Sequence, residues 1–383
     1  MVKKWINMVF VAVLALAWAG AVCAADTIKI GFHAPQTGFA ASDGKSSTEG
    51  ALLAVNQINA AGGILGKQLE LVAYDDQAKP AQSIPIANKL IGQDQVVVGV
   101  SGSYSGATRS AAGVFQEAKI PYVAAYAIHP DVTRAGEYVF RTSFLGQIQG
   151  KAGAKLLGEM MGKKKVVVVT LQNDFGQSLA AGFKEKAADY GITVINEYQY
   201  SIKDRQFGSI VAKVKADDPE AIYASGYYFT AGPLVSQLRA AGVTVPIIGQ
   251  EGYDSQKFIE IAGPAAEGVI ITTSLDRDSD VPETADFIKA FEQQAGFKSD
   301  MVAASSHTAV RVAADAILRA GSTDPEKILA ALKATDLKVS TGTIRFNELG
   351  EVMKAVQVQV VQEGNWHHYA VIDDPDLLAP PAQ

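Results

Sequence analysis

The chain has 383 residues but only one cysteine, Cys23. Cys23 lies in the expected cleavage zone of a secretory signal peptide, so the mature chain would carry no thiol. A disulfide needs two cysteines, and thiolate metal sites or catalytic thiols need at least one. The sequence therefore argues against a disulfide framework, a catalytic cysteine and a thiolate metal site.

Positive charge is also scarce, because 34 lysines and arginines face 40 aspartates and glutamates and give a net charge of −6. Binding to nucleic-acid phosphates requires clustered lysine and arginine, so no nucleic-acid partner is expected. Hydrophobic residues at 48% and charged residues at 19% are typical of a folded protein with a buried core. A chain of this length is long enough for two domains.

Long apolar runs are absent except near the N-terminus, from Met8 to Ala19. This run follows two lysines and precedes a zone of small residues, so residues 1–25 are predicted to be a secretory signal peptide. The run is too short to span a membrane, and the mature protein is expected to be periplasmic. Lipidation at Cys23 is the weaker alternative, since Val22 is bulkier than the residue that usually precedes a lipidated cysteine.

The usual catalytic signatures are missing too: G-x-S-x-G, H-E-x-x-H, G-x-x-x-x-G-K-[ST] and G-x-G-x-x-G do not occur. Ser42 to Lys45 matches S-x-x-K, but the other motifs of that enzyme class are absent. His367 and His368 are adjacent and would point to opposite faces of a strand, which favours solvated edge residues over metal ligands. We therefore expect no enzymatic activity, no cofactor and no metal.

What the sequence does contain is an alternation of short β-branched runs and longer helical patterns from Thr27 onward, which predicts an α/β fold built from βαβ units. One series runs to about residue 141, and a second begins at a helix predicted over 147–161. A third stretch has predicted helices at 283–295, 302–320 and 325–334 and a strand near 341–346, and it should complete one of the two lobes.

Three loops at strand ends carry signals for binding a small molecule. Ser105 follows a predicted strand and precedes a predicted helix. Its hydroxyl and the helix N-terminus would together bind an anion or a carboxylate, or Ser105 would only cap the helix. Glu251 lies between glycines after an apolar strand and faces either a cleft or solvent. Tyr227 offers an aromatic wall with a hydroxyl group, or is a buried core tyrosine.

Five short motifs occur in a fixed order: Thr37-Gly38, 61–66 followed by 71–76, Asn173 to Gly176, Ser225 to Tyr227, and Gly249 to Gly252. In this order and spacing the chain resembles the type I periplasmic solute-binding proteins of ABC importers, in the group similar to leucine/isoleucine/valine-binding protein. The similarity extends from Thr27 to about Tyr369.

The resemblance implies two Rossmann-like lobes joined by hinge strands, with lobe I over 26–145 and 275–357 and lobe II over 146–274 and 358–383. It implies a monomer that closes on a branched-chain amino acid or a related small polar molecule and delivers it to the membrane subunits of an ABC importer. Ser105 would bind the ligand carboxylate, Glu251 and Tyr227 its ammonium group, and Phe175 would line the cleft. A periplasmic sensory subunit, or a binder of an amide or aromatic acid, are the alternatives.

Two departures from the family pattern concern specificity. Tyr126-Ala127-Ile128 stands where amino-acid binders usually have a hydroxyl-bearing turn, so Tyr126 and Ile128 are expected at the ligand. Asp43 stands where branched-chain binders often have a tyrosine. If Asp43 faces the cleft, two carboxylates suit a basic amino acid or an amide; alternatively, Asp43 points to solvent beside Lys45.

Overall fold

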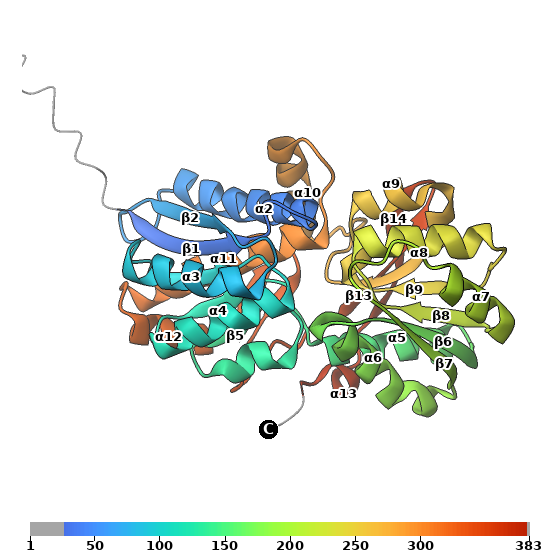
Figure 1. The fold of residues 1–383 in the computed structure, drawn as a ribbon. Coiled ribbons are helices and arrows are strands. Elements are labelled where there is room, and N and C mark those ends of the chain that lie inside the picture. The colour runs from blue at the N-terminus through green and yellow to red at the C-terminus, as the bar shows by residue number, and fades with distance from the viewer. Residues whose placement is uncertain (1–26, 381–383) are drawn as a thin grey trace, which may run out of the picture.

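The structure is a computed structural model that describes residues 27–380. The predicted signal peptide and Cys23 lie outside the described residues. Figure 1 shows two bodies side by side, each a sheet flanked by helices, which confirms the predicted α/β class. Within the described residues, no helix has the length and apolar character needed to cross a membrane.

The first body holds a five-stranded parallel sheet in the order β2-β1-β3-β4-β5. Its register is set by β1 against β2, which pair from Ile28 with Leu69 to Ala34 with Asp75. The strands are β1 (Ile28–Ala34), β2 (Leu69–Asp75), β3 (Val98–Ser101), β4 (Tyr122–Ala124) and β5 (Val139–Arg141). The helices are α2 (Ala41–Ala60), α3 (Pro80–Gly92), α4 (Ser105–Glu117), α10 (Pro282–Ala295), α11 (Met301–Ala320) and α12 (Pro325–Lys333).

The second body holds a seven-stranded sheet in the order β14-β13-β10-β9-β8-β6-β7. The strands are β6 (Lys165–Leu171), β7 (Thr193–Tyr200), β8 (Ala221–Ala224), β9 (Ile247–Gly249), β10 (Ile270–Thr273), β13 (Val356–Gln362) and β14 (Asn365–Ile372); β13 and β14 are antiparallel to their neighbours. The helices are α5 (Gly146–Lys155), α6 (Asp174–Ala187), α7 (Gly208–Asp217), α8 (Tyr228–Ala240), α9 (Gln256–Ala262) and α13 (Pro375–Leu378).

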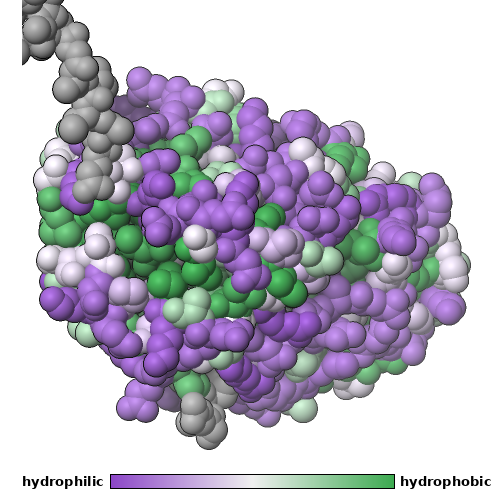
Figure 2. Space-filling view, turned by 60° about the vertical axis from the view of Figure 1, so that its left-hand side comes forward, coloured by the Kyte–Doolittle hydropathy of each residue, from purple (hydrophilic) through white to green (hydrophobic). Residues whose placement is uncertain are grey.

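Strand β6, which lies between β8 and β7, shows why these segments form the sheets. Its four successive valines, 166–169, are all buried, because helices cover both faces of a parallel sheet. Polar side chains cover most of the outer face shown in Figure 2, with apolar ones between them. The folded core therefore lies within and around the two sheets.

The third helical stretch belongs to the first body, where α11 packs along α2 (Figure 1). Ser47 of α2 and Ser306 of α11 are hydrogen-bonded at 2.7 Å between their hydroxyl oxygens. The strand expected near 341–346 is half of a small hairpin, β11 (Leu337–Val339) with β12 (Gly342–Ile344). The chain then returns to the second body as β13, so it passes between the bodies after β5, after β10 and before β13.

Two helices of the second body approach so closely that only glycine fits between them. A Cβ atom on Gly182 of α6 would lie 2.0 Å from the carbonyl oxygen of Gln147 in α5. In α4, by contrast, a Cβ atom on Gly113 would meet no atom within 4 Å. The α5–α6 packing therefore depends on the absence of a side chain at 182.

We predict that Gly182→Ala lowers the free energy of unfolding by about 1–3 kcal/mol, because the added methyl group must push the two helices apart. The matched change Gly113→Ala should leave stability unchanged or raise it by up to about 1 kcal/mol, since alanine favours an exposed helix. Thermal unfolding followed by circular dichroism measures both variants. Equal melting temperatures for the two would show that the close approach carries no energy.

Candidate ligand-binding site

A small cavity lies between the two bodies and is lined by residues of both. The first body contributes Asp43, Tyr104, Ser105, Tyr126, Met301 and Val302, and the second contributes Phe175, Tyr227, Glu251 and Gly252. The cavity therefore suits a small ligand that both bodies contact.

The sheets place these residues together because ligands of open α/β sheets bind outside the carboxyl ends of the strands. Ser105 follows β3, Phe175 follows β6, Tyr227 follows β8 and Glu251 follows β9. Helix caps hold two of the lining segments: the Asn173 side chain accepts a hydrogen bond from the Gly176 N–H at 2.8 Å, which fixes the turn that carries Phe175. Asp300 caps α11 in the same way and fixes Met301 and Val302.

Ser105 is the first residue of α4 and not its cap. The capping position is Tyr104, which makes no side-chain capping bond, so the interpretation of Ser105 as a cap is wrong. The Ser105 hydroxyl oxygen accepts a hydrogen bond from the Ile128 N–H at 3.2 Å. Its own proton is left to donate, and the first N–H groups of a helix have no acceptor within the helix. This part of the cavity wall therefore presents hydrogen-bond donors.

The turn over 126–128 differs in part from its prediction. Tyr126 lines the cavity, and its hydroxyl donates a hydrogen bond to the Gly102 carbonyl at 2.6 Å. The Ile128 side chain is fully buried but is not among the lining residues, because it points toward Gly146 at the start of α5. Only the backbone of Ile128 supports the site, through Ser105.

Three stacked rings join the bodies across the cavity. The rings of Tyr104 and Tyr227 are parallel within 5° and their centroids are 4.1 Å apart, and the ring of Phe175 also stacks on Tyr227, with centroids 4.7 Å apart. The Asn173 amide donates to the Tyr227 hydroxyl at 3.3 Å. Tyr104, Met301 and Val302 were not predicted from the sequence; the position of Tyr104 directly before Ser105 was the one available signal.

Glu251 is 2% exposed and lies in the short helical turn after β9. Within residues 27–380, no group donates a hydrogen bond to either of its carboxylate oxygens. Burial raises the pKa of Glu251 to about 8, while the nearby charges of Lys354 and Arg141 act in the opposite direction. A buried carboxylate without a partner is costly, so this side chain is suited to receive a cation from a ligand.

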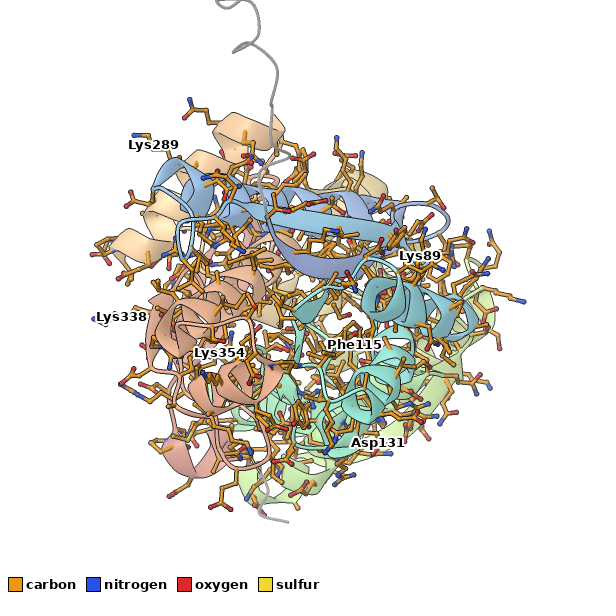
Figure 3. All side chains as sticks on the ribbon, turned by 90° about the vertical axis from the view of Figure 1, so that its left-hand side faces the viewer. Lys89, Phe115, Asp131, Lys289, Lys338 and Lys354 are labelled. Atoms are coloured by element: carbon orange, nitrogen blue, oxygen red, sulfur yellow. The ribbon has the colours of Figure 1, made fainter. Side chains whose placement is uncertain are left out.

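Lys354 lies in the segment before β13 and is buried as well. Figure 3 shows it within the outline of the molecule, whereas Lys289 and Lys338 extend into solvent. Its ammonium group makes no hydrogen bond within the described residues, and burial lowers the pKa of Lys354 to about 8, against the attraction of Glu251. Lys354 thus supplies a positive charge near Glu251 without forming a direct ion pair.

Asp43 is buried at the cavity, and the interpretation that it points to solvent beside Lys45 is wrong. Its carboxylate accepts a hydrogen bond from the Tyr104 hydroxyl at 2.7 Å, and only 4% of the residue is exposed. Burial raises the pKa of Asp43 to about 8, and the neighbouring acids Asp300 and Asp254 add to this effect. Lys45 instead lies over the ring of Phe297, 4.7 Å from its centroid.

The two histidines near the C-terminus lie away from this cavity. His367 contacts Asp278 at 3.2 Å and His368 contacts Asp276 at 2.8 Å, and both histidine side chains are partly exposed. In the part of the chain that the structure describes, no group of three or more histidine, cysteine, aspartate or glutamate residues could hold a metal ion.

Comparison with known proteins identifies the family. The profile described as "Periplasmic binding protein" matches residues 27–365. The chain belongs to the periplasmic binding protein family. This periplasmic binding protein is 32% identical over 348 residues to the leucine-, isoleucine-, valine-, threonine- and alanine-binding protein of Pseudomonas aeruginosa, covering 91% of this chain and 93% of that one.

Solved structures agree with this assignment. The branched-chain amino acid transporter substrate-binding protein LivJ of Streptococcus pneumoniae, in complex with isoleucine, has a TM-score of 0.86 and 28% identity, covering 91% of this chain and 99% of that chain. A solute-binding protein of an ABC transporter from R. palustris, in complex with benzoate, has a TM-score of 0.83 at 24% identity, covering 90% and 96%, and shows the fold alone.

We predict that Glu251→Gln raises the melting temperature of the ligand-free protein at pH 9 and has much less effect at pH 5. Burial raises the pKa of Glu251 from its ordinary value of 4.5 to about 8 in the folded protein. The folded protein therefore loses stability as the pH rises through the interval between these two pKa values. Glutamine is neutral at every pH and avoids this cost.

Melting curves of both proteins at the two pH values test the prediction. Glu185→Gln, which removes a half-exposed acid paired with Lys151, is the matched control. A change in melting temperature for Glu251→Gln that is the same at pH 5 and pH 9 would contradict the burial of a costly charge at 251.

Proposed function

We propose that this protein is exported by a signal peptide over residues 1–25, captures an α-amino acid in the cavity between its bodies, and delivers it to the membrane subunits of an ABC importer. It acts as a monomer, without enzymatic activity and without a cofactor. The single observation that carries the ligand class is the buried, unpartnered carboxylate of Glu251 in a cavity whose other end offers the donor site at Ser105.

An α-amino acid satisfies both ends of this cavity. Its carboxylate accepts hydrogen bonds from the Ser105 hydroxyl and from the first N–H groups of α4, where the helix dipole also favours an anion. Its ammonium group pairs with Glu251, beside the Tyr227 ring. Aromatic walls from Phe175 and Tyr126 cover the rest of the ligand. The relatives are named as binding proteins for branched-chain and other amino acids, which supports an amino acid as the ligand class.

Capture requires the two lobes to close on the ligand. We place residues 26–145 and 275–357 in the first lobe and 146–274 and 358–383 in the second, although β13 itself begins at Val356. Contacts between the lobes include Arg109 with Asp174 at 3.1 Å and the Tyr228 hydroxyl with the Phe39 carbonyl at 3.3 Å. A ligand that contacts both lobes shifts the protein toward the closed form, which the importer then recognises.

An aromatic acid fits the site less well than an amino acid. The rings of the cavity could stack on it, and one neighbour by fold carries benzoate. Such an acid has no cation, however, and would leave Glu251 and Asp43 unpaired beside its own negative charge.

A sensory subunit would use the same closure, and a pull-down from membranes distinguishes it by the partner recovered.

We predict that Glu251→Gln weakens binding of the amino-acid ligand at least tenfold, because removing one partner of a buried charge pair typically costs about 2–5 kcal/mol. A thermal-shift screen against the common amino acids first identifies the ligand, since a ligand at 100 times its Kd stabilises by about 2.7 kcal/mol. Calorimetric titration then compares the variant with Glu185→Gln. Unchanged affinity would remove Glu251 from the site, and the absence of any amino-acid hit would contradict the proposed function.

We also predict that a saturating ligand lowers the radius of gyration measured by X-ray scattering, because the closed form is more compact than the open one. The same samples, checked by calorimetry for binding, serve as their own control. Identical scattering curves with and without bound ligand would indicate a cleft that is closed before the ligand arrives, and would argue against capture by lobe closure.

A further inference from the structure

We propose that Asp43 selects amino acids whose side chain ends in a nitrogen hydrogen-bond donor, a protonated amine above all. This inference rests on the proposed function, because it assumes that an α-amino acid occupies the cavity with its ammonium group at Glu251. It goes beyond that function by assigning the side chain of the ligand, for which Asp43 is the receiving group.

The geometry of Asp43 leaves one carboxylate oxygen for a ligand. Asp43 lies in the first turn of α2 and lines the cavity. Its Oδ2 atom accepts the hydrogen bond from Tyr104, and within residues 27–380 no group donates to Oδ1. The residue is therefore buried at the cavity wall, and within the described residues one of its two carboxylate oxygens receives no hydrogen bond.

The charges around the cavity give Asp43 no cation of its own. The ten residues that line the cavity, all within the described part of the chain, include no lysine or arginine. Lys45, two residues along α2, turns away to Phe297. Lys354 is a neighbour of Glu251 and contributes to the pKa of that group, but not to the pKa of Asp43.

The nearby acids add negative charge where Asp43 already has no lysine or arginine as a partner. Asp300 raises the pKa of Asp43, yet Asp300 is itself satisfied by the Ser46 hydroxyl at 2.6 Å and the Ala303 N–H at 2.8 Å. With the ligand's ammonium group at Glu251 and its carboxylate at Ser105, Asp43 is the remaining unpaired acid. A nitrogen donor on the ligand's side chain supplies the missing partner, which an aliphatic side chain cannot.

The rings next to Asp43 favour a positive charge as well. Tyr104, which holds Asp43, lies against Tyr126 with ring centroids 6.5 Å apart and planes inclined by 76°, and against Tyr227 in the parallel stack. Aromatic faces attract cations, most strongly where water is excluded. Asp43 is thus hydrogen-bonded to one tyrosine, Tyr104, whose ring contacts two more, and this is a suitable environment for an amine at the end of a short side chain.

Calorimetric titration with matched pairs of amino acids tests this inference: lysine against norleucine, ornithine against norvaline, and glutamine as the uncharged donor. We expect at least one of the three nitrogen-bearing ligands to bind at least about tenfold tighter than the aliphatic amino acids, the scale of one buried charge-assisted hydrogen bond. Asp43→Asn should reduce this preference about tenfold for the charged ligands, measured as the ratio of the Kd of norleucine to the Kd of lysine.

Asp189→Asn, which removes an exposed acid paired with Lys186, is the control of equal charge. If Asp43→Asn does not fold, Asp43→Ser takes its place. Aliphatic amino acids that bind as tightly as all nitrogen-bearing ones, or a preference that Asp43→Asn and Asp43→Ser leave intact, would overturn the role of Asp43 and leave the proposed function standing. If no amino acid of any kind binds, the proposed function fails first.

Discussion

The site depends on the free energy of burying a carboxylate without a protein partner. Glu251 can lie in the closed cavity only as a neutral acid or opposite a positive charge, because water no longer solvates its charged form. A ligand's ammonium group removes that cost, so the interaction that binds the ligand also stabilises the closed arrangement of the two lobes. Affinity and closure are therefore one equilibrium in this account.

The fold places the lobes so that this coupling extends to the connecting segments. Arg141, at the end of β5, forms a buried ion pair with Glu351 at 2.7 Å, which ties two of the three connections between the lobes together. Lys354 follows three residues later and brings its charge near Glu251. The segment that joins β12 to β13 thus carries Glu351, one member of this ion pair, and also Lys354, whose charge acts on Glu251.

Local sequence patterns predicted what local geometry determines. Ser105, Tyr227 and Glu251 each follow a strand directly, and the carboxyl edge of a parallel sheet brings such residues together. The α/β class was predicted from the alternation of strand and helix patterns and the family from a resemblance carried by five short motifs, and the comparisons confirm both. Residues outside such patterns, such as Met301 and Val302, depend on how α11 packs against the rest of the lobe, which no single segment of sequence specifies.

The two uncertain positions, Asp43 and Ile128, show the same limit in detail. Ser42 to Ser47 carries no apolar periodicity that would indicate a helix, yet α2 begins at Ala41 and places Asp43 at the cavity. Gly44 allows this start, since a Cβ atom there would lie 2.0 Å from the Pro35 carbonyl oxygen. Ile128 lies in an irregular turn, where alternation of faces cannot be read from the sequence, and its side chain lies against Gly146 and not at the cavity.

A crystal structure of the protein saturated with its amino-acid ligand tests the central claim most directly. The account predicts the ligand's ammonium nitrogen within hydrogen-bonding distance of the Glu251 carboxylate and its carboxylate at the Ser105 hydroxyl and the first N–H groups of α4. A ligand bound in the reverse orientation, or one that leaves the Glu251 carboxylate without a cationic partner in the closed protein, would contradict it.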